Sequence, residues 1–278
     1  MRKGEIKGRL DDALVAAWNV RQRLVYAAAP VALKQRLRAN AHLRNAYRGH
    51  RCFILGNGPS LAQQDLTALA GEHTFVVNQF IRHPQAAVID PTFYVMIDAK
   101  VEQGVWGTAF LEDIERQLPK VQVFATAAGR QYFDDRRVLT GHTVHTIHPE
   151  LNFHFGFGGS CAPTGPMPCA TNVTKAAFFL AAYLGFNPIY LLGIDGNGLI
   201  AQGNTHFYGR YASATTQAQF ESDLMAMSMG LRGWRAIAAW SEQQGIDVFY
   251  ANPAGIIEAF PRVRLEDVVS VVELPRCG

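Results

Sequence analysis

The chain has 278 residues, of which 49% are hydrophobic and 18% are charged, and its formal net charge at pH 7 is +3. This length and composition are typical of one large α/β domain, or of one domain with an extension. No apolar run reaches the roughly 18 residues of a transmembrane helix, and the charged N-terminal residues are unlike a signal peptide. The four cysteines lack the spacing of a metal site, so we expect a reducing, cytoplasmic setting.

The positive charge is concentrated at the start of the chain. Residues 1–51 contain twelve Lys and Arg but three Asp and Glu, a net charge of +9, which leaves −6 for the remainder. This asymmetry predicts a separate role for the first 50 residues, and we expect a basic helical extension over residues 1–48 and a separate domain over residues 49–278. Helices are predicted at 9–28 and 31–47, and the first has residues near helical spacing: Leu14, Ala17, Trp18, Arg21 and Val25.

Two interpretations of this extension stay open. In one, it is a basic amphipathic surface that contacts anionic lipid headgroups, so that the protein lies peripherally on the inner membrane. In the other, it packs on the domain or on another subunit of a homo-oligomer, with a solvated basic face. Nucleic acid is not an expected partner, because few aromatic residues are interleaved with the basic ones.

From Arg51 onward, strand-like and helix-like stretches alternate along the chain. Strands are predicted at 52–56, 74–78, 92–97, 121–125, 143–147, 188–193 and 246–250, and helices at 60–70, 108–117, 172–184 and 216–243. Such alternation predicts an α/β fold with a mostly parallel, doubly wound, Rossmann-like sheet that helices cover on both faces. Ligands of these sheets bind beyond the carboxyl ends of the strands.

The first predicted strand leads directly into a glycine-rich turn, Gly56-Asn57-Gly58-Pro59-Ser60, which precedes helix-forming residues. Glycines let a ligand approach the backbone, and the amide groups of a first helical turn attract anions. We therefore expect a nucleotide phosphate at this turn, although a plain tight turn explains the pattern equally well. The turn lacks the third glycine of the dinucleotide-binding motif and the lysine of a P-loop.

Polar residues follow four of the predicted strands, namely Asn78, Asp98, Asp195 and Asn252. Short polar side chains at this edge of a parallel sheet are placed for ligand contact. Each one alone is equally well explained as a helix cap or a loop residue. Four together favour a nucleotide-binding site.

Residues 151–170 form a long segment that is rich in Gly, Pro and Phe. An irregular segment of this length inside a compact domain is often a functional lid. We expect this segment to cover the nucleotide.

A loop from Asn204 to Tyr211 contains the acid–base candidate. His206 titrates near neutral pH and is suited to accept a proton from an acceptor hydroxyl, although a lone loop histidine is often structural. Three neighbours are suited to donate hydrogen bonds to a departing phosphate: Tyr208, Arg210 and Tyr211. No motif such as His-Glu-x-x-His is present, so no metal ligands are predicted.

Five motifs occur in a fixed order between about Arg48 and Arg264: Gly56-Asn-Gly-Pro-Ser-Leu61, Val77-Asn-Gln-Phe80, the run from Leu184 to Asp195, His206-Phe207, and Tyr250-Ala-Asn-Pro253. Their order resembles that of the small bacterial sialyltransferases that use CMP-activated sialic acid. Three stretches resemble even more closely the bacterial proteins grouped with the MptE-like 6-hydroxymethylpterin diphosphokinases: 52–61, 91–98 and 254–262.

The sialyltransferase resemblance implies a variant of the GT-A fold, inversion at the transferred sugar, and catalysis without a metal. It implies that Asn57 and Asn78 contact the phosphate and ribose of the nucleotide, with Ser60 at the same turn. It also implies that His206 is the general base. The start of a helix would lie against the donor, at Asn172, Val173 and Thr174.

The chain departs from the sialyltransferase pattern after Asp195. It has Gly196-Asn197-Gly198 where those enzymes place a tyrosine that stabilises the leaving CMP. Tyr208 and Tyr211 are the substitutes that the sequence offers. The identity of the transferred sugar is therefore not fixed by the resemblance.

The predicted function is transfer of a nonulosonate or related keto-acid sugar from a CMP-sugar to a glycan or lipid-linked acceptor, without a cofactor. The first alternative is an ATP-dependent diphosphokinase that acts on a pterin and needs magnesium. The second is a non-catalytic nucleotide-binding protein of a polysaccharide assembly.

Overall fold

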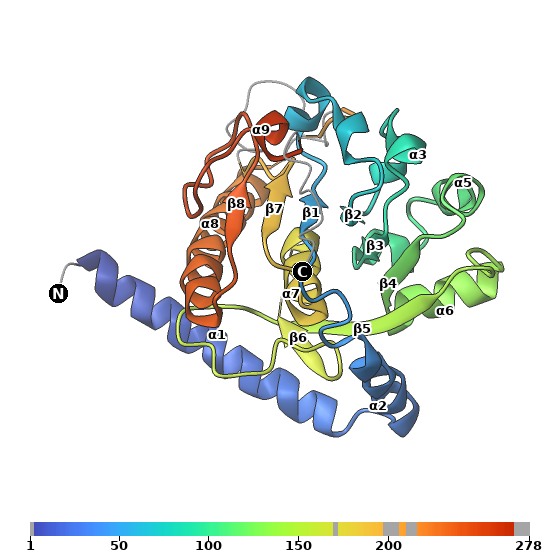
Figure 1. Cartoon of the computed structure of the whole chain (residues 1–278). Coiled ribbons are helices and arrows are strands. Elements are labelled where there is room, and N and C mark those ends of the chain that lie inside the picture. The colour runs from blue at the N-terminus through green and yellow to red at the C-terminus, as the bar shows by residue number, and fades with distance from the viewer. Residues whose placement is uncertain (1–2, 169–171, 197–205, 210–215, 270–278) are drawn as a thin grey trace, which may run out of the picture.

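The computed structural model describes residues 3–168, 172–196, 206–209 and 216–269. Its strands form one eight-stranded parallel sheet in the order β6-β5-β4-β3-β2-β1-β7-β8 (Figure 1). The strands are β1 (Cys52–Leu55), β2 (Thr74–Val77), β3 (Phe93–Met96), β4 (Gln122–Thr126), β5 (Val144–Leu151), β6 (Pro166–Pro168), β7 (Ile189–Leu192) and β8 (Val248–Tyr250). The predicted α/β fold and all seven predicted strands are confirmed.

The strand order places a switch point between β1 and β7. The chain runs outward from β1 to β6 and then returns to place β7 and β8 on the other side of β1. Leu55, the last residue of β1, pairs with Leu192, the last residue of β7. Connections leave the two strands in opposite directions at this point, which is where parallel α/β sheets open a ligand crevice.

Each strand contributes side chains to two hydrophobic cores, because successive residues of a strand point to opposite faces. In β1, Cys52 and Ile54 belong to one core, whereas Phe53 belongs to the other. The first core is covered by α7 (Val173–Leu184) and α8 (Gln217–Gln244).

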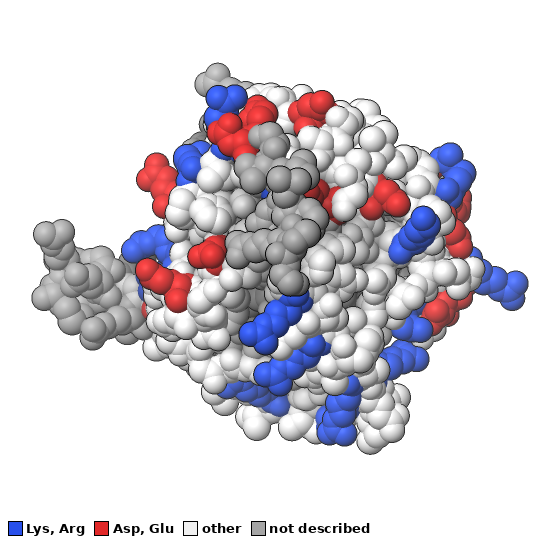
Figure 2. Space-filling model, viewed as in Figure 1, with Lys and Arg blue, Asp and Glu red and all other residues white. Residues whose placement is uncertain are grey.

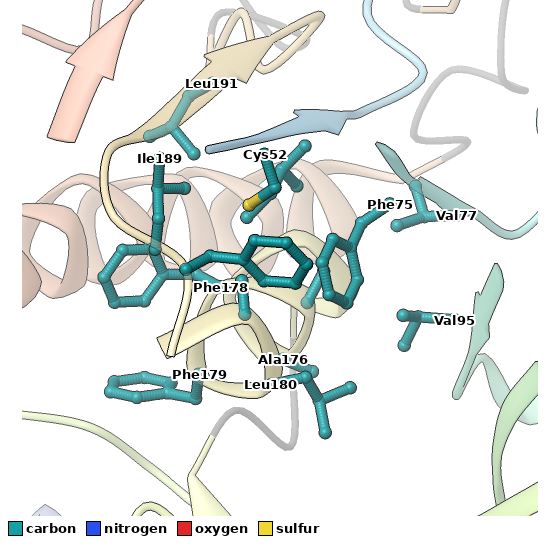
Figure 3. Close-up of a cluster of buried hydrophobic side chains, with 14 of the residues drawn as sticks. Cys52, Phe75, Val77, Val95, Ala176, Phe178, Phe179, Leu180, Ile189 and Leu191 are labelled. Atoms are coloured by element: carbon teal, nitrogen blue, oxygen red, sulfur yellow. The ribbon is translucent and has the colours of Figure 1, made fainter. Parts of the chain in front are cut away.

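The helix α7 is the centre of the first core. Its residues from Ala176 to Ala181 are fully buried, and Figure 3 shows Phe178 and Leu180 among strand side chains such as Cys52 and Ile189. A helix that is apolar on all sides has to be buried on all sides. Burial also raises the pKa of the Cys52 thiol well above its usual value, so this thiol stays protonated.

The second core is covered by short helices. They are α3 (Ala86–Ile89), α4 (Ala99–Glu102), α5 (Ala109–Gln117), α6 (Ala127–Arg136), α9 (Leu265–Val269) and the 3₁₀ helices η2 (Pro59–Gln63), η3 (Leu66–Leu69) and η4 (Phe80–Arg82). The helix predicted at 60–70 is therefore wrong in type, since η2 and η3 replace it. The two are separate because the Asp65 side chain accepts a hydrogen bond from the Thr67 amide and starts a new turn.

The N-terminal segment forms α1 (Lys3–Ala27), α2 (Val31–Arg38) and the 3₁₀ helix η1 (Ala39–Leu43). Asn19 of α1 binds the backbone of Asn152 through two hydrogen bonds, of 2.8 and 2.9 Å. Asp12 forms an ion pair of 2.6 Å with Arg232 of α8. The helix α1 therefore packs on the domain, while the proposed division at residue 48 stays a prediction. In the described part of the chain, no helix is both long and apolar enough to cross a membrane.

The segment between β5 and β6 does not cover the crevice, so the predicted lid is wrong for the described residues 152–168. Phe153 packs instead on Phe179 of α7, with ring centroids 4.8 Å apart, and on Trp240 of α8. The carbonyl of Pro163 accepts a hydrogen bond of 3.0 Å from Asn40. Phe153 thus packs on an apolar surface of the first core, away from the carboxyl ends of the strands.

Candidate active site

A cleft of about 590 Å³ opens at the carboxyl ends of the strands around the switch point between β1 and β7. It brings together nine of the residues that the sequence singled out: Asn57, Gly58, Asn78, Asp98, Asn172, Val173, Thr174, Asp195 and His206. Four others do not line it: Gly56, Ser60, Tyr208 and Asn252. Arg210 and Tyr211 lie outside the described residues, so their roles stay predictions.

Three of the polar residues, Ser60, Asp195 and Asn252, bind one another and form what we call the buried polar cluster. All three are at most 6% exposed. The Asp195 carboxylate accepts hydrogen bonds from the Ser60 amide at 3.0 Å and from the Asn252 side-chain nitrogen at 2.5 Å. The Ser60 hydroxyl lies 2.5 Å from Asp195 Oδ1 and 2.6 Å from Asn252 Oδ1, and its single proton serves one of them.

The cluster joins the ends of β1, β7 and β8. Asn252 Oδ1 also accepts a hydrogen bond of 2.9 Å from the Gly193 amide, and its nitrogen donates to the Tyr250 hydroxyl at 3.0 Å. The Tyr250 hydroxyl in turn donates to the Ile194 carbonyl at 2.8 Å, and the Arg262 guanidinium lies 5.0 Å from the centre of the Tyr250 ring. These hydrogen bonds engage the polar groups of the cluster within the protein, so the role of the cluster is structural.

Three amides of the glycine-rich turn are engaged within the protein, so the expected phosphate contact at this turn stays a prediction. The Gly56 amide donates to Leu192 O and the Gly58 amide to Gly193 O, each at 2.8 Å, and the Ser60 amide donates to Asp195. Glycine is required here by close packing of the chain: a Cβ at Gly58 would lie 2.6 Å from Asp195 Oδ2. The turn begins a 3₁₀ helix of five residues, too short for a substantial dipole.

Asn57 and Asn78 differ from the residues of the buried polar cluster, because their side-chain oxygens have no hydrogen-bond partner within the described residues. The Asn57 nitrogen donates to Val77 O at 3.1 Å, but the side-chain oxygens of Asn57 and Asn78 are buried and accept no hydrogen bond within the described residues. Asn78 has a left-handed backbone with φ of +48°, and the Tyr94 hydroxyl fixes it by donating to its carbonyl at 2.6 Å. Unpaired buried acceptors are costly, and both line the cleft, so they are available to donor groups of a ligand.

His206 reaches the cleft on a tight turn. Its amide and carbonyl each form a hydrogen bond of 3.1 Å with the backbone of Gly209. The Phe207 amide donates to Asn57 O at 3.0 Å, and the Phe207 ring lies 5.0 Å from that of His83. The hydrophobic anchor Phe207 therefore fixes His206 beside the end of β1.

The environment of this turn changes the acidity of both candidate groups. Burial, and secondly the positive charge of Lys100, lower the pKa of His206 below its usual value. The ring of Tyr208 stacks on that of His206, with centroids 4.9 Å apart. Burial raises the pKa of Tyr208 to about 12, with Arg82 opposing the rise and Asp98 adding to it. At neutral pH the imidazole is thus a neutral base and the phenol is a proton-bearing donor.

The opposite wall of the cleft begins with α7. Asn172 caps this helix, since its side chain accepts hydrogen bonds from the amides of Thr174 at 3.0 Å and Lys175 at 3.2 Å. The positive end of a twelve-residue helix therefore borders the cleft. The rest of this wall is apolar and comes from α8, through Met227, Leu231 and Trp234.

Two lysines near the cleft were missed from the sequence. Lys175 is only 7% exposed, and its ammonium donates to Gly230 O at 2.8 Å and lies 5.5 Å from the Trp234 ring. Lys100 follows the cap of α4, where Asp98 accepts a hydrogen bond of 2.9 Å from the Lys100 amide. The sequence did carry a signal for Lys175, which is the single charged residue within the apolar run of α7. A lysine buried in such a run requires a polar partner.

No cluster of three or more His, Cys, Asp or Glu side chains suited to a metal occurs among the residues that the structure describes. The carboxylates at the cleft are engaged separately. Asp195 belongs to the buried polar cluster and Asp98 caps α4.

No protein-family model matches this chain, and no curated protein matches it either. Among solved structures, sialyltransferase CstII from Campylobacter jejuni in complex with the substrate analogue cytidine-5′-monophosphate aligns with a TM-score of 0.43 and 16% identity, over 78% of this chain and 85% of that one. Sialyltransferase CST-II in complex with a trisaccharide acceptor and CMP gives 0.40 and 17%, over 77% and 85%. The apo α-2,3-sialyltransferase from Campylobacter jejuni gives 0.40 and 15%, over 77% and 80%. These likenesses are too weak to assign a function to this chain.

Proposed function

We propose that this chain is an inverting glycosyltransferase that moves a nonulosonate or related keto-acid sugar from a CMP-sugar to a hydroxyl of a glycan or glycolipid. The observation that carries the proposal is that His206 lies in the same cleft as the unpaired oxygens of Asn57 and Asn78. Ribose hydroxyls can donate hydrogen bonds to such oxygens, whereas an ionised phosphate has no donor. We therefore assign both asparagines to the ribose.

The charge around the cleft fits an anionic donor. The phosphate of a CMP-sugar and the carboxylate of a keto-acid sugar are both negative, and the cleft is bordered by the positive end of α7. Lys175 lies between α7 and α8, and Lys100 is close enough to affect the pKa of His206. These two cations support an anionic donor and do not distinguish its phosphate from its carboxylate.

In the proposed reaction, the neutral imidazole of His206 accepts the proton of the acceptor hydroxyl as the hydroxyl oxygen attacks the anomeric carbon. The bond from that carbon to the phosphate oxygen of CMP breaks, and CMP leaves with the electron pair. Tyr208 stacks on His206 and does not line the cleft, so its role as a hydrogen-bond donor to the leaving phosphate stays a prediction from the sequence. The proton on His206 passes to solvent before the next turnover.

The first test is thermal melting of the whole chain with CMP, CDP, UDP, GDP, ATP or AMP, each with and without magnesium. A ligand at about 100 times its dissociation constant stabilises a protein by about 2.7 kcal/mol, which is readily measured. We expect a shift with CMP or CDP that does not depend on magnesium. A shift that requires ATP or AMP together with magnesium would instead favour the diphosphokinase, which at present no observation in the cleft supports.

A further inference from the structure

The helix α1 turns a polar face toward the domain. Asp12, Asn19 and Gln22 recur at helical spacing, and Asn19 and Gln22 are at most 9% exposed. Asn19 and Asp12 form the contacts to Asn152 and Arg232. Hydrogen bonds and an ion pair therefore hold α1 on the domain, together with ring contacts of Tyr26 with His148 and of Arg23 with Phe157.

The outward face of α1 is apolar, the reverse of a normal surface helix. Leu14 is 72% exposed and Leu24 is 68% exposed. Trp18, Val20 and Val25 are exposed by 46%, 55% and 53%. Leu14, Trp18 and Val25 share one side of the helix, and Leu24 and then Val20 extend the exposed apolar surface around it. Arg21 projects from the same surface, with its guanidinium 5.5 Å from the Trp18 ring. We call this surface the apolar patch. Patches of this kind commonly mark a contact surface for another molecule.

Basic residues accompany this patch along the chain. Seven occur between residues 21 and 48, and none takes part in an ion pair within the described chain: Arg21, Arg23, Lys34, Arg36, Arg38, Arg44 and Arg48. Figure 2 shows Lys and Arg gathered over the lower part of the molecule, where Figure 1 places α2 and the C-terminal end of α1. Together with the apolar patch they form what we call the α1–α2 surface.

Two of these cations line a second cavity. Arg44 and Arg48 border a space of about 680 Å³ at the C-terminal ends of α7 and α8, together with Tyr183 and Trp240. Guanidinium groups bind phosphate through paired hydrogen bonds, and aromatic rings suit the boundary between headgroups and acyl chains. The cavity thus offers room for a phospholipid headgroup at the edge of the α1–α2 surface.

We propose that the α1–α2 surface docks this protein on an anionic phospholipid membrane. The aliphatic patch enters the boundary between headgroups and acyl chains, and the seven cations lie at the phosphate level. A nucleic acid would use the cations but leave the leucines and valines without a partner. A symmetric second copy would bring the same excess of positive charge against itself. The proposal does not depend on the glycosyltransferase assignment.

The test is co-sedimentation of the full chain with vesicles of phosphatidylcholine alone, and with vesicles that contain phosphatidylglycerol in equal amount. We expect binding to the anionic vesicles that weakens as salt is raised. Replacing both Arg36→Ala and Arg38→Ala should lower the partition coefficient by about 30-fold, since each surface cation contributes about five-fold. The control is Arg116→Ala with Lys120→Ala, two exposed cations at the end of α5, which should change nothing.

The contribution of the apolar patch on α1 is tested with a matched control of the same residue type. Val20→Ser with Val25→Ser should lower partitioning by at least about five-fold. Val88→Ser with Val105→Ser changes two valines of similar exposure, 54% and 63%, elsewhere on the surface and should have no effect. All four variants change exposed residues, so circular dichroism and melting should match the parent protein.

Equal binding to neutral and anionic vesicles, or no binding to either, would overturn the proposal. So would a parent protein that is a dimer by light scattering and that Val20→Ser with Val25→Ser turns into a monomer, because a second copy would then cover the patch. Neither outcome affects the nucleotide test of the cleft, in which no lipid is present.

Discussion

Two groups of polar residues meet at the same edge of the sheet, yet they behave differently. The buried polar cluster of Ser60, Asp195 and Asn252 satisfies its own hydrogen-bonding groups. Asn57 follows β1, as Ser60 does, and Asn78 follows β2, yet their side-chain oxygens remain unpaired within the described residues. A polar residue that follows a strand is therefore not by itself a ligand contact. Completion of its hydrogen bonds distinguishes a structural role from a binding role.

The largest effect that this comparison predicts is on stability. Asp195→Ala removes the acceptor for the Ser60 amide and the Asn252 side chain, both buried. Leaving such donors unpaired should lower the free energy of unfolding by about 3–5 kcal/mol, measured by urea denaturation. A variant as stable as the parent would show that the cluster is not structural, and the comparison would fail.

The next effect concerns turnover and tests the other group. His206→Ala should reduce transfer from a CMP-sugar by about 100-fold or more, because general-base catalysis contributes at least this much. The melting shift caused by CMP should persist, since the base acts in the transition state rather than in donor binding. His154→Ala, in the exposed segment between β5 and β6, is the control. Unchanged turnover in His206→Ala would remove the histidine from the mechanism.

A smaller effect is expected on nucleotide affinity. Asn78→Gly removes the unpaired oxygen, and glycine accepts the left-handed φ of +48° without strain. The dissociation constant for CMP should rise by about 5–10-fold, the value of one hydrogen bond, with little loss of stability. Asn45→Gly is a matched control, because Asn45 has φ of +57° at the other end of the sheet. Calorimetry of both variants measures stability and affinity for CMP. An Asn78→Gly variant that lost stability but kept its affinity for CMP would show that Asn78 has a structural role and does not bind the nucleotide.

The smallest effect is a shift in pH dependence. Because the pKa of His206 is lowered, its imidazole stays neutral at pH values where an ordinary histidine is protonated. We therefore expect kcat/KM to fall only when the pH drops through this lowered pKa. Lys100→Met removes one of the two causes of the lowering, and the acidic limb of the profile should move to higher pH. The shift should be under about one unit, since burial remains. Lys120→Met should leave the profile in place, and a limb that does not move in Lys100→Met would exclude Lys100 as a cause.

The sheet could be predicted from the sequence because its strands are short apolar runs whose alternate residues fill two cores. The exception, β6, contains Pro166 and Pro168, which lack amide protons and are tolerated because the strand lies at the edge. The 3₁₀ helices at 59–69 look like one α-helix by composition. Side-chain hydrogen bonds divide them, since Gln85 accepts from the Leu66 amide and Asp65 accepts from the Thr67 amide. Composition does not show these bonds.

The site was harder to predict, since strand ends show where polar residues gather but not which way they point. Asp195 and Asn78 look alike in sequence, but the partners of Asp195, which are Ser60 and Asn252, lie more than fifty residues away along the chain. Asn78 is fixed instead through its backbone carbonyl, by Tyr94. The phenylalanines at 153–157 predicted a lid because they needed an apolar surface. The structure provides that surface for Phe153 on α7 and α8, a contact between distant segments that no local pattern contains.

The helix α7 runs between the cleft and the region beside the α1–α2 surface, so its length relates the positions of the two. Its N-terminus borders the cleft, and its last carbonyls, of Tyr183 and Leu184, accept hydrogen bonds from Asn45 and Tyr47 beside the α1–α2 surface. Twelve residues of α-helix span roughly 18 Å. On a membrane docked at that surface with α7 along the membrane normal, a hydroxyl next to its lipid anchor would lie about this far below the reacting atoms. Under the two proposals together, this distance would favour acceptor hydroxyls on longer glycans over those next to the lipid anchor.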